Sequence, residues 1–327
     1  MTGNKTVRAA AALMAAALPL SAPAAEQVAN YPERPIRLIV PFPPGGGTDL
    51  VSRTIQPALA ARLGQQIVID NRGGAQGILG TQIAASSAPD GYTLVIAEIG
   101  ATAVAPALTP NAPVDPVRDF APISQLIVQP YIMSINPSVP ARTLGEFIKL
   151  AQAKSGTLNY GSGNVTAHVM QEVFFRTAKV SLQHIPYRGS GPSVAALLSN
   201  EVQTIFSGPG AAIPQIKAGK IRAIAVTTLK RSRELPDIPT LDESGYRGFE
   251  ISGWYGIMAP AKTPRPIVVR LNSDIVAVLS SGETPKLLAA RGYDPTPTTP
   301  DAFAKYLRSE VARWSKAVKE YGIKSIE

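Results

Sequence analysis

The chain has 327 residues, no cysteine and a formal net charge of +9. The lack of cysteine excludes disulfides, thiol catalysis and cysteine-ligated metal sites. A positive charge favours anionic partners, but the densest basic group, Lys230, Arg231 and Arg233, has no aromatic residues for stacking bases, so we expect no nucleic-acid partner.

The first 24 residues have the three parts of an export signal. Lys5 and Arg8 give a basic start, residues 9–20 form an apolar run, and Ala22-Pro23-Ala24 matches the cleavage pattern of small residues. The apolar run is shorter than the ~20 residues that a membrane-spanning helix needs. We therefore predict a cleaved signal peptide over residues 1–24 and a free, soluble protein in the periplasm.

The residues after the signal alternate between strand and helix patterns. Apolar runs predict strands, and apolar positions three or four apart predict helices. In chain order the first predicted elements are a strand at 36–42, a helix at 50–63, a strand at 67–69, a helix at 78–87 and a strand at 93–97. This alternation predicts an α/β fold with a largely parallel sheet that helices cover on both faces.

A second series of elements begins with a strand at 126–135. It continues with helices at 144–153, 165–177 and 194–198, and with strands at 157–160, 183–186, 202–206, 221–226 and 251–257. From Pro266 to about Tyr321 the pattern is mostly helical, so this part needs an existing sheet to pack on. We therefore predict that the chain returns to its first domain. Domain one then comprises 31–131 and 253–327, and domain two comprises 132–252.

The segment PFPPGGGTD, Pro41 to Asp49, joins the first predicted strand to its helix. Its glycines allow a ligand to approach the backbone, and the first N–H groups of a helix lack internal partners and favour anions. The segment lacks the Lys-Ser/Thr of a Walker A loop, and Leu50 replaces the third glycine of a dinucleotide-binding loop. The alternative is an ordinary connection in which Thr48 caps the helix.

Two further segments also follow predicted strands. YGSGNVTAH, Tyr160 to His168, repeats the arrangement of strand, glycines and helix start, and PYRGSGP places Tyr187 and Arg188 after the next strand. Arg188 could pair with a carboxylate or face solvent, and His168 could face the ligand or be structural. Ligands of open α/β sheets bind beyond the carboxyl ends of the strands. Together the loops predict a cleft that holds an anion from both sides.

The sequence offers little support for an enzyme. It contains neither a G-x-S-x-G nor an H-E-x-x-H motif, and its only imidazoles belong to His168 and His184. A catalytic triad is defined by geometry rather than by sequence order, so a periplasmic hydrolase of small esters or amides remains the alternative function. We predict no cofactor, no metal and no catalytic residue.

Several motifs occur in a consistent order from about Tyr31 to the C-terminus. They are YPERPIRLIVPFPPGGGTD, NR-G-x-x-G, APDGYTL, YGSGNVTAH, PYRG and LPDIPTLDESG. As a set they resemble the extracytoplasmic solute receptors of tripartite tricarboxylate transporters, the Bug family. The resemblance implies a type II periplasmic-binding-protein fold, in which two α/β domains close around a dicarboxylate, an amino acid or an aromatic acid. It also implies a monomer that serves a two-component membrane permease or a sensor.

Three positions depart from the family pattern. Gly73 stands where proline is frequent, Glu98 to Ala101 replace small polar residues, and Ser207 replaces an acidic residue. Glu98 could face solvent, pair with Arg188 or accept an N–H group of the ligand. The predicted ligand-binding residues are Phe42, Gly46, Gly47, Thr48, Asp49, Glu98, Ala101, Gly161, Ser162, Gly163, Thr166, His168, Tyr187, Arg188 and Ser207.

Overall fold

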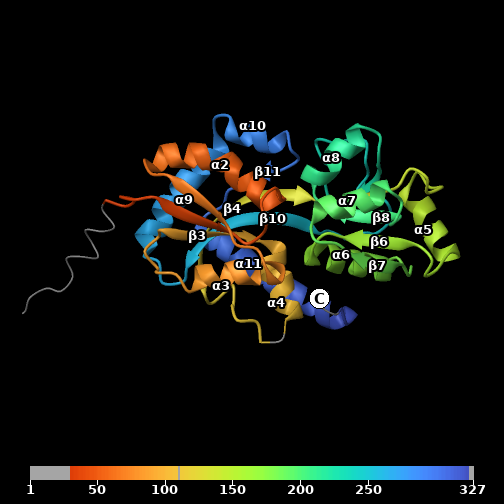
Figure 1. The fold of residues 1–327 in the computed structure, drawn as a ribbon, viewed down its shortest axis with the longest axis horizontal. Helices are drawn as coiled ribbons and strands as arrows, with labels where there is room; N and C mark the ends of the chain where they lie inside the picture. The colour runs from red at the N-terminus through yellow and green to blue at the C-terminus, as the bar shows by residue number, and fades with distance from the viewer. Residues whose placement is uncertain (1–29, 110, 324–327) are drawn as a thin grey trace, which may run out of the picture. The chain divides into compact units, whose positions relative to one another are not determined.

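A computed structural model describes residues 30–109 and 111–323 (Figure 1). The predicted signal peptide lies outside these ranges. Within these ranges, residues 32–109 and 111–323 belong to one compact unit. No helix in the described ranges is long and apolar enough to span a bilayer.

The first sheet has six strands in the order β11-β4-β10-β3-β1-β2. Their bounds are β1 Ile36–Val40, β2 Ile67–Asn71, β3 Thr93–Glu98, β4 Phe120–Pro130, β10 Ser252–Pro260 and β11 Asp294–Pro295. Strand β1 pairs in parallel with β2 and β3, whereas β10 runs antiparallel to both β3 and β4. The sheet is therefore mixed rather than largely parallel, because β10 enters it from the opposite direction after the chain has built the second sheet.

Helices cover both faces of the first sheet. On one side α2 (Gly47–Leu63) contacts α9 (Arg265–Ser280) and α10 (Thr284–Ala289). On the other side lie α3 (Ile78–Ala85), the π-helical turn η2 (Gly100–Val104), α4 (Ala105–Leu108) and α11 (Pro300–Tyr321). Figure 1 shows α2 and α10 above this sheet and α3 and α4 below it. A short 3-10 turn, η1 (Ala75–Gly77), precedes α3.

The second sheet has five strands in the order β7-β6-β8-β5-β9. Their bounds are β5 Ile132–Ile135, β6 Asn159–Ser162, β7 Gln183–Pro186, β8 Thr204–Ser207 and β9 Arg222–Val226, and the accompanying helices are α5 Leu144–Ala153, α6 Val165–Thr177, α7 Ser190–Leu198 and α8 Pro209–Lys217. Strand β6 is parallel to β7 and β8, and β5 is antiparallel to β8 and β9. This sheet is also mixed.

The chain crosses between the two sheets at two places. Thr227 forms hydrogen bonds with both crossover segments. At the first crossover, the Thr227 hydroxyl accepts from the Tyr131 N–H at 3.0 Å, and the Thr227 N–H donates to the Tyr131 carbonyl at 3.0 Å. At the second, the hydroxyl donates to the Ile251 carbonyl at 2.5 Å, and the Ile251 N–H donates to the Thr227 carbonyl at 2.9 Å. The described residues from Pro32 onward nevertheless belong to one compact unit, so the division into two domains stays a prediction.

A buried network attaches the last helix to the first sheet. The indole N–H groups of Trp254 in β10 and Trp314 in α11 both donate to Oε2 of Glu310, each at 3.2 Å. Arg313 contacts the other carboxylate oxygen of Glu310 at 3.4 Å. Both tryptophans and Glu310 are buried. One carboxylate therefore satisfies two indole donors that would otherwise be unpaired in the core.

Candidate functional site

The first predicted loop is held in place by Asp49. Its carboxylate accepts from the Gly45 N–H at 3.0 Å, from Nε of Arg53 at 3.0 Å and from Nδ2 of Asn71 at 3.1 Å. Burial raises the pKa of Asp49, but these hydrogen bonds outweigh burial and bring the pKa below its ordinary value. Asp49 therefore supports the loop with a carboxylate that is already engaged. The predicted cap by Thr48 is wrong, because α2 begins at Gly47 and its N-cap is Gly46.

The start of α2 lies against two tyrosine hydroxyls. A Cβ atom added to Gly47 would collide with the Tyr255 hydroxyl and would lie 3.1 Å from the Tyr293 hydroxyl. At Gly46 the nearest atom to an added Cβ would be the Pro43 carbonyl oxygen, at 3.8 Å. Both glycines were predicted to contact a ligand. A side chain would fit at Gly46, but the structure leaves no room for one at Gly47.

These tyrosines belong to a polar cluster that sequence reasoning missed. Gln129 donates through Nε2 to the Tyr255 hydroxyl at 3.1 Å, and a Cβ atom at Gly210, in the first turn of α8, would lie 2.9 Å from the Tyr293 hydroxyl. Burial raises the pKa of Tyr293 to about 12 and that of Tyr255 well above its ordinary value. Both phenols therefore stay protonated at neutral pH and can donate. The Tyr293 hydroxyl lies between the first turns of α2 and α8, and the Tyr255 hydroxyl lies against α2.

Glu98 is buried at the carboxyl end of β3, with an exposed fraction of 5%. Its Oε2 accepts from the Ala101 N–H at 2.9 Å, and the Gly100 N–H also donates to the carboxylate. Its Oε1 lies 3.4 Å from the Thr166 hydroxyl, which in turn bonds to the Tyr131 hydroxyl. Burial raises the pKa of Glu98 despite these donors. The contact with Thr166 joins the end of β3 to the first turn of α6.

This geometry excludes two of the three predicted roles of Glu98. A solvent-facing side chain is wrong, because the carboxylate is buried. A pair with Arg188 is wrong as well: Arg188 is exposed, and within the described residues no ion pair joins it to Glu98. Acceptance of a ligand N–H group stays a prediction, and the structure shows Glu98 accepting from the backbone N–H groups of Gly100 and Ala101.

The second predicted loop is tightly packed. Asn164 caps α6, because its side-chain oxygen accepts from the Ala167 N–H at 2.8 Å. A Cβ atom at Gly163 would lie 2.5 Å from both the carbonyl carbon and the carbonyl oxygen of Gly189. At Gly161 an added Cβ would lie 3.1 Å from the Tyr187 ring. The loop therefore depends on its glycines for packing against the segment that carries Tyr187.

The remaining predicted residues fall at different places. Phe42 and Ala101 meet at Gly77, where an added Cβ would lie 3.1 Å from the Phe42 ring and 2.6 Å from the Ala101 methyl group. Ser207 ends β8 and is 3% exposed, and its hydroxyl has no hydrogen-bond partner among the described residues. Unpaired buried hydroxyls are rare in folded proteins and call for a specific explanation. The next residue, Gly208, would place a Cβ 3.4 Å from the Gln129 side chain of the polar cluster.

His168 lies in a separate group of side chains beside β6. Its ring stacks on that of His184 with centroids 4.1 Å apart, and its Nδ1 lies 3.2 Å from the Tyr160 hydroxyl. Nε2 of His184 lies 2.7 Å from the Ser162 hydroxyl, but Ser162 is only 1% exposed. Among the described residues no carboxylate hydrogen-bonds to His184, so this pair lacks the group that orients the base in a catalytic triad.

The histidine pair predicts a pH dependence of stability. Burial, followed by repulsion from His168, lowers the pKa of His184 to about 4, and burial also lowers the pKa of His168. The unfolded chain therefore binds more protons between about pH 6.5 and 4, so stability falls as the pH decreases through this window. We expect the Tm to fall between pH 7 and 5, and to fall less in His184→Gln. Equal slopes of Tm against pH in both proteins would contradict the assignment.

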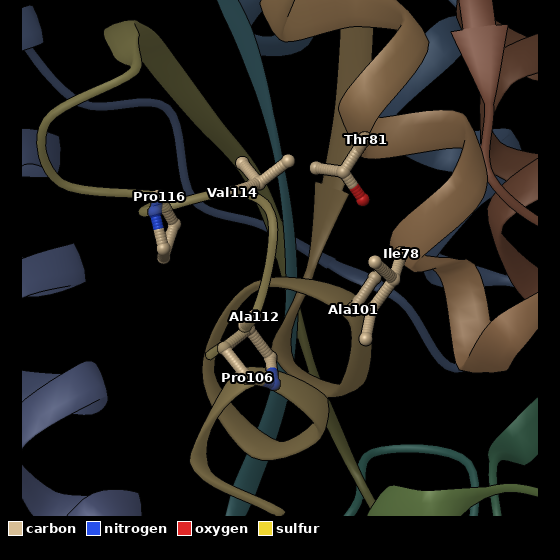
Figure 2. Close-up of a pocket in the computed structure, with 7 residues that line it drawn as sticks. All are labelled: Ile78, Thr81, Ala101, Pro106, Ala112, Val114 and Pro116. Carbon is tan, nitrogen blue, oxygen red and sulfur yellow. The ribbon is translucent and has the colours of Figure 1, made fainter. Parts of the chain in front are cut away.

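Two hollows in the described structure lie mostly outside the predicted site, which shares only Ala101 with the first of them. One has a volume of about 10 Å³, enough for a single water molecule. Figure 2 shows the residues that line it: Ile78, Thr81, Ala101, Pro106, Ala112, Val114 and Pro116. The other is an open groove of about 600 Å³ beside Pro260 to Lys262. Pairing in the sheet places Tyr255 opposite Glu98 and Pro260 opposite Phe120, so the groove lies at the other end of the strands from Glu98. In the described ranges no group of histidine and acidic residues could hold a metal ion.

Comparison with known proteins identifies the family. The model of the tripartite tricarboxylate transporter family receptor matches residues 51–323. The chain belongs to this receptor family. It is 37% identical to protein BugT of Bordetella pertussis, over 90% of this chain and 91% of that protein.

Two solved structures support the same assignment. One, described as a periplasmic transporter, has a TM-score of 0.85 and 36% identity, over 90% of this chain and 99% of that one. The other, R. palustris Rpa4515 with adipate, has a TM-score of 0.85 and 33% identity, over 90% of this chain and 100% of that one. The predicted family and periplasmic-binding-protein fold are confirmed. The protein is a solute-binding receptor of the tripartite transporter family, which is not enzymatic, so the hydrolase alternative is set aside.

Proposed function

We propose that this receptor binds a small organic carboxylate in the periplasm and delivers it to a two-component membrane permease. The ligand lies where the first turns of α2 and α6 meet the end of β3. The observation that carries the proposal is the tyrosine cluster beside Gly47: two buried phenols that stay protonated lie against the first turn of a helix. Phenolic O–H groups and the N–H groups of a helix start all donate to a carboxylate.

Three further observations support this proposal. The relative that was solved with adipate matches 90% of this chain, and adipate is a dicarboxylate. The unpaired Ser207 hydroxyl offers another buried donor at the end of β8. The predicted export signal supports a periplasmic location and a cleaved receptor. A receptor that serves a sensor instead of a permease would use the same site, and deletion of neighbouring permease genes would then leave the cellular response to the ligand intact.

Substitution at the start of α2 tests the site. Gly47→Ala places a methyl group against the two tyrosine hydroxyls, so we expect it to abolish the rise in Tm that adipate produces in the parent protein. A ligand at 100 times its Kd stabilises a protein by about 2.7 kcal/mol, which is readily measured by thermal unfolding. Gly145→Ala, in α5 and outside the proposed site, is the control, because an added Cβ there meets no atom within 4 Å and its response should be retained. Equal responses in both variants would rule out this site.

A further inference from the structure

Glu98 differs from the other buried acids of the protein. In the described part of the chain, the buried acidic residues are Asp49, Glu98, Asp274 and Glu310. Three of them contact an arginine: Asp49 contacts Arg53 at 3.0 Å, Asp274 contacts Arg270 at 2.7 Å, and Glu310 contacts Arg313 at 3.4 Å. Within the described ranges Glu98 has no such partner. An ionised carboxylate without a counter-charge is unfavourable in a protein interior.

The surroundings of Glu98 hold the carboxylate at a fixed position. Two consecutive N–H groups, of Gly100 and Ala101, donate to it from the turn that follows β3, so the side chain cannot move away without losing both bonds. The carboxylate lies directly against the Gly100 backbone, because a Cβ atom at Gly100 would lie 2.8 Å from each carboxylate oxygen. The Thr166 hydroxyl is 3.4 Å from Oε1, a weak contact that leaves this oxygen able to accept another hydrogen bond.

The position of Glu98 relates it to the proposed carboxylate site. Thr166 joins Glu98 to the first turn of α6, and Tyr255 pairs with Glu98 across the sheet. The Tyr255 hydroxyl in turn lies against Gly47 at the start of α2. A carboxylate without a cation therefore adjoins groups that attract anions. A carboxylate beside neutral hydrogen-bond donors in this way is complementary to a ligand that carries both a carboxylate and a cationic nitrogen.

We propose that Glu98 is the counter-ion for an ammonium group of the ligand, so that the receptor selects amino carboxylic acids over plain dicarboxylates. This inference rests on the proposed function, because the helix starts and the tyrosine hydroxyls must hold the carboxylate of the same ligand. Glu98 then determines specificity. The ammonium group supplies the charge that arginine supplies to the other three buried acids.

Calorimetry with three acids of the same chain length tests the proposal. The probes are adipate, 2-aminoadipate, which adds an ammonium group, and 6-aminohexanoate, in which an aminomethyl group (CH2–NH3+) replaces one carboxylate. We expect the parent protein to bind one of the amino acids more tightly than adipate. Glu98→Gln should weaken that ligand by about 30-fold or more, because it leaves a buried ammonium group unpaired. The same variant should bind adipate at least as well as the parent does.

Control variants separate charge from folding. Glu98→Asp keeps the charge and should keep the preference for the amino ligand. The Tm of each variant, measured without ligand, shows whether the variant is folded. Tighter binding of adipate than of either amino acid, with uptake of a proton, would show that Glu98 binds as a neutral acid and would overturn the inference while the proposed function stands. Failure of the folded parent protein to bind any of the three acids would instead overturn the proposed function.

Discussion

Gly163→Ala is expected to destabilise the protein and to abolish ligand binding, although it adds a single methyl group. The added Cβ would lie 2.5 Å from the carbonyl carbon and oxygen of Gly189 and 2.7 Å from the Ser190 nitrogen. These are backbone atoms, which cannot rotate away as a side chain can. The Gly189 N–H also donates to the Gly163 carbonyl at 3.0 Å, so the two segments cannot separate without losing this bond. Overpacking of this kind costs about 1–3 kcal/mol.

The measurement is urea unfolding, followed by calorimetry with whichever acid the parent protein binds. Gly191→Ala is the control, because an added Cβ at Gly191 meets no atom within 4 Å. It lies in α7, where alanine is favoured over glycine by up to about 1 kcal/mol, so it should be neutral or stabilising. If Gly163→Ala unfolded at the same urea concentration as the parent, the close packing of Gly163 against Gly189 and Ser190 would be contradicted.

Glu310→Ala is expected to lower the free energy of unfolding by roughly 2–5 kcal/mol. The substitution leaves the indole N–H groups of Trp254 and Trp314 without their acceptor, and each unpaired buried donor costs about 1–3 kcal/mol. Glu310→Gln retains a carbonyl acceptor and should lose less. Glu320→Ala, at an exposed position of the same helix, is the control and should change the free energy by less than about 0.5 kcal/mol. A loss no larger than that of the control would contradict the proposed network.

The sequence predicted the bounds of helices and strands well where apolar periodicity and capping residues mark them. Helices 144–153 and 165–177 and strand 183–186 have the predicted bounds. For α5 the periodic apolar residues are preceded by a capping box at Thr143 and Glu146. Helix α8 was missed because Pro209 and Pro214 interrupt its pattern, although a proline at the first helical position is favourable. The direction of β10 was not predicted, because strand polarity depends on which sheet the chain has just left.

The candidate site was only partly visible in the sequence. Glycine-rich segments after strands indicated both loops, and Glu98 was noticed because it departs from the family pattern. Tyr131, Tyr255 and Tyr293 were not identified, since aromatic residues in apolar strands have the same pattern as an ordinary core. Their role depends on contacts between residues far apart in the chain, such as that of Tyr293 with Gly47 and Gly210. The absence of an arginine beside Glu98 could likewise be recognised only in three dimensions.

The bonds of Thr227 to Tyr131 and Ile251 have a mechanical consequence. Two independent connections would let the sheets twist or slide past one another as well as separate. Here both connections are hydrogen-bonded to Thr227, so a shift of one connection relative to the other would break these bonds. Thr227 is fully buried, so water could not replace the lost bonds. The two connections must therefore bend together as one hinge. We therefore expect the predicted opening and closing of the two domains to follow one rotational path, which would bring the loops before α2 and α6 back to the same register each time a solute enters.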